Sequence, residues 1–135
     1  MDLKALAQEM QERRSRVKRV ASTRGFDATL VIGRAPDRAG DMRYLCGNKP
    51  YLSGHISRYG YRGRGFGALL LPTDSGAEPT LVCTTPFYIP PIDVEDIVID
   101  THFSRGIASA LKRHGLTEAN IGLVGVDILS VLLYQ

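Results

Sequence analysis

Hydrophobic residues recur every three or four positions at the start of the chain and gather into short runs further on. Residues 2–24 combine apolar side chains at helical spacing with acidic residues early and basic residues late, and Gly25 follows as a stop signal. This pattern predicts an amphipathic helix over residues 2–24. The apolar positions that define it are Leu3, Leu6, Met10, Val17, Val20 and Ala21.

Short apolar runs after this helix predict strands. Residues 28–33 form a β-branched run typical of a central strand, and residues 42–46 predict a short second strand that Gly47 closes. Residues 67–71 and 80–84 flank a stretch rich in Pro, Asp, Ser and Gly. Turn residues between two apolar runs predict an antiparallel hairpin.

The last third of the chain alternates strands and helices. Residues 96–100 predict a short strand, residues 103–114 a helix that ends at a glycine, and residues 121–125 a further buried strand. Asp127 is placed to cap a final helix over residues 128–135. The apolar residues of that helix have nothing downstream to pack against, so we expect the chain to be a fragment.

This order of elements predicts an α/β domain with a mixed sheet of about five to six strands flanked by helices. Residues 1–135 contain no internal repeat and no linker, so we expect one domain, truncated at its C-terminal end. The longest uninterrupted aliphatic run is Ala68–Leu71, too short for a membrane span or a signal-peptide core. We therefore expect a cytoplasmic protein without a membrane partner.

The net charge of +3 hides an uneven distribution. Residues 1–24 carry seven Lys or Arg and three acids, residues 34–64 carry seven and two, and residues 74–100 carry six acids and no base. The basic run from Arg13 to Arg19 could grip phosphates, but a charged outer face is the commoner use of such a run on a surface helix. Cys46 and Cys83 lie in apolar, strand-like contexts, which predicts buried, reduced thiols.

The segment between Gly47 and Gly67 concentrates the unusual chemistry of the chain. It contains glycines, aromatic residues, one histidine and several cations, and no acid. A long loop inside a small domain is often functional, and arginine beside aromatic rings suits binding of a carboxylate or a phosphate. Single-stranded nucleic acid, a solvated connection and an oligomer contact are the alternatives. The candidate binding residues are His55, Tyr59, Tyr61, Arg62, Arg64 and Phe66.

Catalytic sequence signatures are missing. The chain has no G-x-S-x-G, H-E-x-x-H, C-x-x-C or Walker loop, and its clustered glycines precede a predicted strand rather than open a helix. Asp100 and His102 are near neighbours, but a single Asp-x-His is a weak metal signal. We therefore predict no catalytic residue, no metal ligand and no cofactor in this chain.

Four stretches, in order, resemble the N-terminal domain of the creatinase/prolidase family of Xaa-Pro peptidases. The first is Gly25-Phe-Asp-Ala-Thr-Leu-Val-Ile, after a basic amphipathic helix, and the second is Asp41-Met-Arg-Tyr-Leu-Cys-Gly. The third is Ala68-Leu-Leu-Leu-Pro-Thr-Asp with Glu78-Pro-Thr-Leu-Val, and the fourth is Ile121-Gly-Leu-Val-Gly-Val-Asp-Ile-Leu-Ser. The family usually has Asn where Asp41 stands and Thr or Ser where Cys46 stands.

The resemblance implies a ribonuclease H-like mixed sheet that serves as the non-catalytic half of a dimeric metal-dependent hydrolase. Its divalent metal (Mn, Co or Zn) would lie in a following catalytic domain, and its partners would be that domain, a second subunit and a small peptide or amino-acid-derivative substrate. In creatinase-like relatives an aromatic residue and an arginine just before the hairpin reach the substrate of the neighbouring subunit, which points to Arg62, Arg64 and Phe66 here. The substrate would be an Xaa-Pro peptide or, alternatively, an amidino or cyclic amino-acid derivative. A nucleic-acid-binding module is the less favoured alternative.

Overall fold

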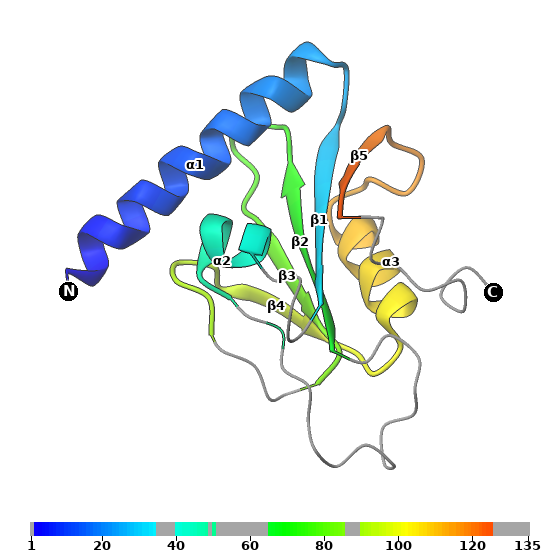
Figure 1. Ribbon diagram of the computed structural model, residues 1–135. Coiled ribbons are helices and arrows are strands. Elements are labelled where there is room, and N and C mark those ends of the chain that lie inside the picture. Colours follow the sequence, from blue (N-terminus) through cyan, green and yellow to red (C-terminus); the bar gives the residue numbers. More distant parts are fainter. Residues whose placement is uncertain (1, 35–39, 49, 51–64, 86–89, 126–135) are drawn as a thin grey trace.

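The computed structural model describes residues 2–34, 40–48, 50, 65–85 and 90–125. Within them the chain forms three helices and five strands (Figure 1). In chain order these are α1 (Leu3–Thr23), β1 (Ala28–Arg34), α2 (Gly40–Cys46), β2 (Phe66–Pro72), β3 (Thr80–Cys83), β4 (Asp96–Ile99), α3 (Phe103–Arg113) and β5 (Ile121–Val124). The predicted α/β architecture with a mixed sheet is confirmed.

The five strands form one sheet in the order β4-β3-β2-β1-β5. β1, β2 and β3 make an antiparallel meander, so the predicted hairpin and the predicted central strand are confirmed. β4 joins β3 and β5 joins β1 in parallel pairings, which place these two strands at opposite edges. The sheet is therefore antiparallel in its middle and parallel at both ends.

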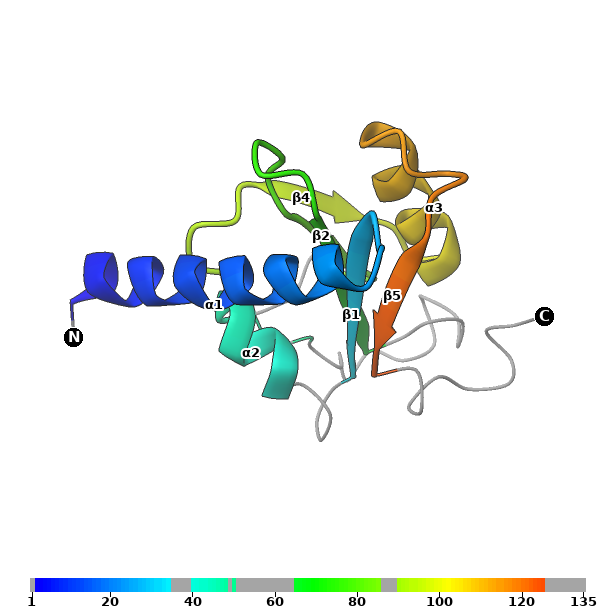
Figure 2. The ribbon, with the colours of Figure 1, turned by 90° about the horizontal axis from the view of Figure 1, so that it is seen from above.

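Helices cover both faces of the sheet. α1 and α2 lie on one face and α3 on the other (Figures 1 and 2). The α2 side buries a cluster that includes Met42, Leu69 and Leu81, and the α3 side buries one that includes Leu70 and Phe103. Both clusters draw on alternate residues of the same strands, as a two-sided sheet requires.

Glycine ends both long helices as predicted. After α1, Gly25 has a φ of +76°, and the Phe26 N–H donates to the Ala21 carbonyl at 3.0 Å. After α3, Gly115 has a φ of +67°, and the Leu116 N–H donates to Leu111 at 2.9 Å. Glycine adopts this left-handed conformation without steric cost, and the resulting bonds satisfy carbonyls at the helix end.

Two predictions about the strands are wrong. Residues 42–46 belong to the helix α2, where Met42, Leu45 and Cys46 are buried. The last strand, β5, is at an edge and leaves Leu123 and Val124 exposed, so it is not a buried strand. The predicted final helix over residues 128–135 lies outside the described residues. None of the described helices is long and apolar enough to cross a membrane.

Candidate functional site

Most of the predicted binding residues fall on the segment between α2 and β2. His55, Tyr59, Tyr61, Arg62 and Arg64 lie outside the described residues. Phe66 is described, and it is the first residue of β2 rather than the last residue of a loop.

The Phe66 side chain is only 8% exposed and belongs to the core on the α3 side. Its ring centroid lies 5.5 Å from that of Phe103. A buried aromatic pair of this kind stabilises the packing of α3 on the sheet. The expectation that Phe66 lies outside the strands is therefore wrong, because the strand begins one residue earlier than its glycine-rich sequence suggested.

The two ends of the α2–β2 segment are held together. α2 is followed by Gly47, with a φ of +76°, and by the buried residue Asn48. Pro50 packs against Gly67 of β2, where an added Cβ would lie 3.0 Å from the Pro50 ring. The chain on the two sides of residues 51–64 is thus in contact through Pro50 and Gly67.

A buried ion pair lies at the end of α2. Arg14 of α1 is 6% exposed and donates to the Leu45 carbonyl at 2.7 Å and to Asp93 Oδ2 at 2.6 Å. The Ile92 N–H donates to the Cys46 carbonyl at 2.7 Å. These contacts join α1, the end of α2 and the segment before β4.

The sequence interpretation missed this ion pair because Arg14 sits within a basic run. The signal was available in part, since Arg14 is four residues after Met10 and seven before Ala21, and all three are buried. Asp93 gave no such signal. Its φ of +59° is the only positive value at a described residue other than glycine, and Asp is among the residues that tolerate this conformation best.

The two cysteine thiols are poor nucleophiles. Cys46 and Cys83 are free and buried, which confirms the prediction, although Cys46 lies on a helix. Burial raises the pKa of Cys46 to about 11 and that of Cys83 to about 12. Since the thiolate is the reactive form, neither thiol is suited to nucleophilic attack at neutral pH.

Asp100 and His102 organise the start of α3. Asp100 accepts the His102 backbone N–H at 2.9 Å and two bonds from the Arg105 guanidinium, at 2.6 and 2.7 Å. The bonds from Arg105 hold the pKa of the Asp100 carboxyl below its ordinary value. The described residues contain no group of three or more His, Cys, Asp or Glu able to hold a metal ion.

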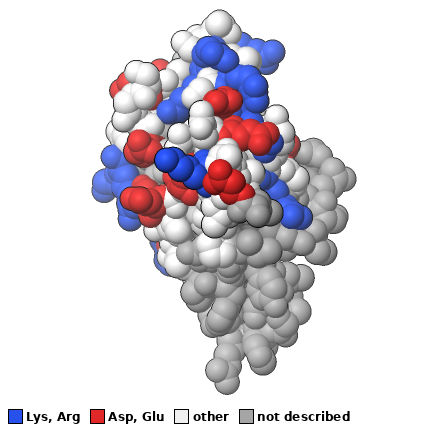
Figure 3. Space-filling model, turned by 90° about the vertical axis from the view of Figure 1, so that its left-hand side faces the viewer, with Lys and Arg blue, Asp and Glu red and all other residues white. Residues whose placement is uncertain are grey.

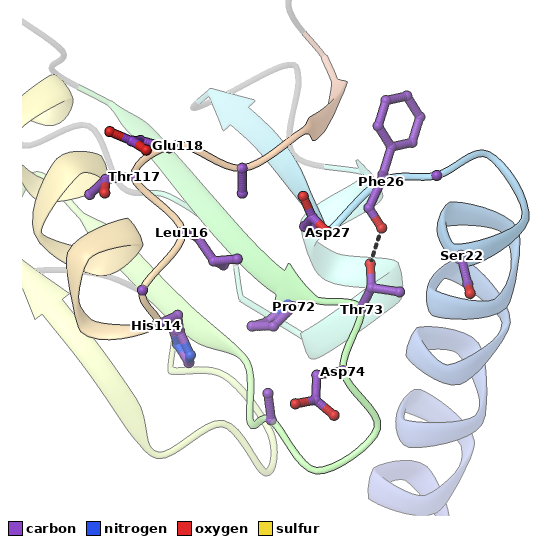
Figure 4. A pocket seen from close by; sticks show the side chains of 14 residues that line it. Ser22, Phe26, Asp27, Pro72, Thr73, Asp74, His114, Leu116, Thr117 and Glu118 are labelled. Atoms are coloured by element: carbon purple, nitrogen blue, oxygen red, sulfur yellow. Dashed lines mark hydrogen bonds between the residues drawn. The ribbon is translucent and has the colours of Figure 1, made fainter.

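An open hollow of about 890 Å³ lies where β1 begins, β2 ends and α3 stops (Figure 4). Several of its polar groups hold loops in place. Thr73 donates to the Phe26 carbonyl at 2.9 Å, and Asp27 accepts the Asn120 N–H at 2.9 Å. The His114 Nε2 lies 2.7 Å from the hydroxyl of Thr80. That hydroxyl is fully buried and donates to Asp96 Oδ2 at 2.5 Å, so it is not placed to attack a molecule in the hollow.

A second hollow of about 510 Å³ lies between α1 and β5. It is lined by apolar residues and by Arg13, Arg16 and Arg24, with no acidic residue.

No protein-family model, no curated protein and no solved structure matches this chain.

Proposed function

We propose that this chain is the non-catalytic N-terminal domain of a cytoplasmic, metal-dependent hydrolase of the creatinase/prolidase type, with Xaa-Pro peptides as its substrate class. The observation that carries the proposal is the ordered series of family-like stretches. They fall in sequence on the start of β1, on α2, on the β2–β3 hairpin and on β5 with the residues after it. Three of the stretches include strands of the one mixed sheet, and the second lies on α2, the helix that packs against it.

The absence of a metal-ligand cluster among the described residues is compatible with this role. In the proposed assignment the metal-dependent step belongs to a following domain, and the described residues offer no competing metal site. This chain would contribute to dimerisation and to the substrate pocket of a neighbouring subunit.

The α2–β2 segment is the part suited to such a contribution. Its cations and aromatic residues, His55, Tyr59, Tyr61, Arg62 and Arg64, could pair with a substrate carboxylate and cover an apolar ring. The packing of Pro50 on Gly67 gives the segment a fixed base. The burial of Phe66 limits that residue to supporting this base from the core.

The contacts made by the cations of α1 weaken the nucleic-acid alternative, because they engage these side chains within the domain. Arg14 is buried against Asp93, Arg13 contacts Glu9, and Lys18 donates to the Ala77 carbonyl. On the face drawn in Figure 3, basic and acidic side chains are interspersed over the described residues. A phosphate-binding surface needs a continuous basic field instead.

The test compares the chain with the protein encoded by the reading frame continued beyond Gln135. With Mn²⁺ or Co²⁺, we expect the longer protein to hydrolyse Xaa-Pro dipeptides and the chain alone to be inactive. Creatine and cyclic amino-acid derivatives, assayed in parallel, distinguish an amidinohydrolase relative. Turnover by the repurified chain, or a natural stop codon directly after Gln135, would overturn the proposal.

A further inference from the structure

The hollow between α1 and β5 is lined by exposed apolar residues, as interaction surfaces often are. The described residues include six large hydrophobic side chains that are exposed, and four of them line this hollow. These are Val20, Tyr44, Leu123 and Val124, with exposed fractions of 52%, 54%, 55% and 39%. Apolar side chains gathered at one place on a surface, with a charged rim, are typical of an interaction site.

The charge of the rim is of one sign. Arg13 contacts Glu9, and its guanidinium carbon lies 4.1 Å from the centre of the Tyr44 ring. Arg16 and Arg24 are exposed, and among the described residues no acid lies within ion-pair distance of either. An occupant of this hollow should therefore bring acidic groups as well as apolar ones.

The helix that borders the hollow, α1, carries acidic and apolar groups in its N-terminal half. We call Asp2, Leu6, Glu9, Arg13, Arg16, Val20 and Arg24 the α1 stripe. Successive members are three or four residues apart, so they lie along one side of the helix. The N-terminal half of the stripe is acidic and apolar, and the C-terminal half is basic and apolar. The stripe is therefore complementary to itself when two copies run antiparallel.

We propose that two copies of this chain associate through antiparallel α1 helices, each placing its N-terminal half in the α1–β5 hollow of the other. With a two-fold axis at Arg13, Asp2 faces Arg24 of the second copy and Leu6 faces its Val20. The two Arg13 side chains meet at the axis, and the contact of each with Glu9 of its own chain offsets their like charge. Glu9 falls one residue from the position opposite Arg16. Residues 2–12 span about 15 Å of helix, and the part of α1 that lines the hollow, residues 13–24, spans about 16 Å.

Other occupants fit less well. Pairing of the open β5 edges of two copies without the helices would leave Arg16 and Arg24 unpaired. Residues 126–135 contain one acid, Asp127, to set against three arginines. A right-handed connection from β5 to a further parallel strand outside it would also pass over the α3 face, as the connection from β4 does.

This association is independent of the proposed function and uses a different surface from the α2–β2 segment. Sedimentation of the chain should show a dimer with a dissociation constant on the order of 1–100 µM, because five of the seven stripe positions are charged. The dimer should weaken as salt rises. A chain that stays monomeric at ~1 mM in low salt would overturn the proposal.

Substitutions test the surface. Val20→Asp and Arg16→Glu should each raise the dissociation constant at least tenfold, because they add an acid to the apolar centre or invert the rim. The matched controls are Ile99→Asp, at an exposed hydrophobic residue on β4, and Arg19→Glu, an exposed residue of α1 outside the stripe. Neither control should change the dimer. Circular dichroism would verify that all four variants are folded.

Disulfide trapping tests the antiparallel register. The double variant Leu6→Cys with Val20→Cys should form covalent dimers under oxidised glutathione, whereas each single variant should not. Equal trapping of the single variants would contradict the antiparallel arrangement. A dimer that survives Val20→Asp but is lost on replacing Tyr59 and Tyr61 with Ser would assign association to the α2–β2 segment and overturn this proposal, leaving the proposed function intact.

Discussion

Replacing Arg14 with methionine should strongly destabilise the domain. The substitution keeps an unbranched side chain in the space beneath α2 but removes the donors to the Leu45 carbonyl and to Asp93. Asp93 is only 14% exposed, so its carboxylate would remain largely buried without a counter-charge. Removing one partner of a buried ion pair typically costs about 3–5 kcal/mol.

This loss is a large fraction of the stability of a domain. Single domains are stable by about 5–15 kcal/mol, and for a chain of this size the change corresponds to a fall in melting temperature of roughly 10–20 °C. Urea denaturation followed by circular dichroism would measure it. The stability of Arg14→Lys should lie between that of the parent and that of Arg14→Met, because an ammonium lacks the guanidinium fork that reaches both acceptors at once.

Two further variants distinguish the loss of the ion pair from the loss of any arginine on α1. Arg19→Met removes an exposed arginine from the same helix, outside the α1 stripe, and should change the free energy of unfolding by less than about 0.5 kcal/mol. Arg14→Met combined with Asp93→Asn should recover part of the loss, because the uncompensated charge is gone while a residue that tolerates positive φ is kept. A loss below about 1 kcal/mol for Arg14→Met alone would refute the reasoning.

Three other predictions follow from packing and from charge. Phe66→Ala should lower the free energy of unfolding by about 3–5 kcal/mol in urea denaturation, because Phe66 is in the core. A change near zero would mean that Phe66 is not a core residue. Gly106→Ala should lower the free energy of unfolding by about 1–3 kcal/mol, since the added methyl would lie 2.8 Å from Val82 Cγ1. Gly40→Ala, with open space around it, should be neutral or stabilising. Asp100→Asn should be less stable than the parent at pH 7. The pKa of Asp100 is lowered by Arg105 in the folded state, so its contribution is present above the ordinary value of about 3.9 and is lost as pH falls through the lowered pKa; an unchanged difference down to pH 2 would contradict this.

Local signals were sufficient for most elements. The glycine stops, the turn-rich stretch before Thr80 and the β-branched run at Ala28 each depend on neighbours in sequence, and the structure agrees with them. The error at α2 was one of period. Met42, Leu45 and Cys46 are spaced as i, i+3 and i+4, which is helical, but five residues before a glycine are too few for periodicity to decide.

Long-range features were beyond a single sequence. The composition of Ile121-Gly-Leu-Val suits a buried strand, and only the strand order places it at an edge with two side chains exposed. The Arg14–Asp93 pair joins residues that nothing in their local sequence connects. The candidate site stays a prediction, because five of its six proposed residues lie outside the described part of the chain.

The strand order also bears on how the domain forms during synthesis. One edge of β1 pairs with β2, the next strand along the chain, but its other edge pairs with β5, so the pairing of Ala28 with Ile121 can form only after residue 121 has been translated. Contacts this distant in sequence slow folding, because a long loop must close before they form. We expect the β1–β2–β3 meander to fold early with one edge of β1 exposed to other nascent chains. That edge is protected only once β5 has been translated.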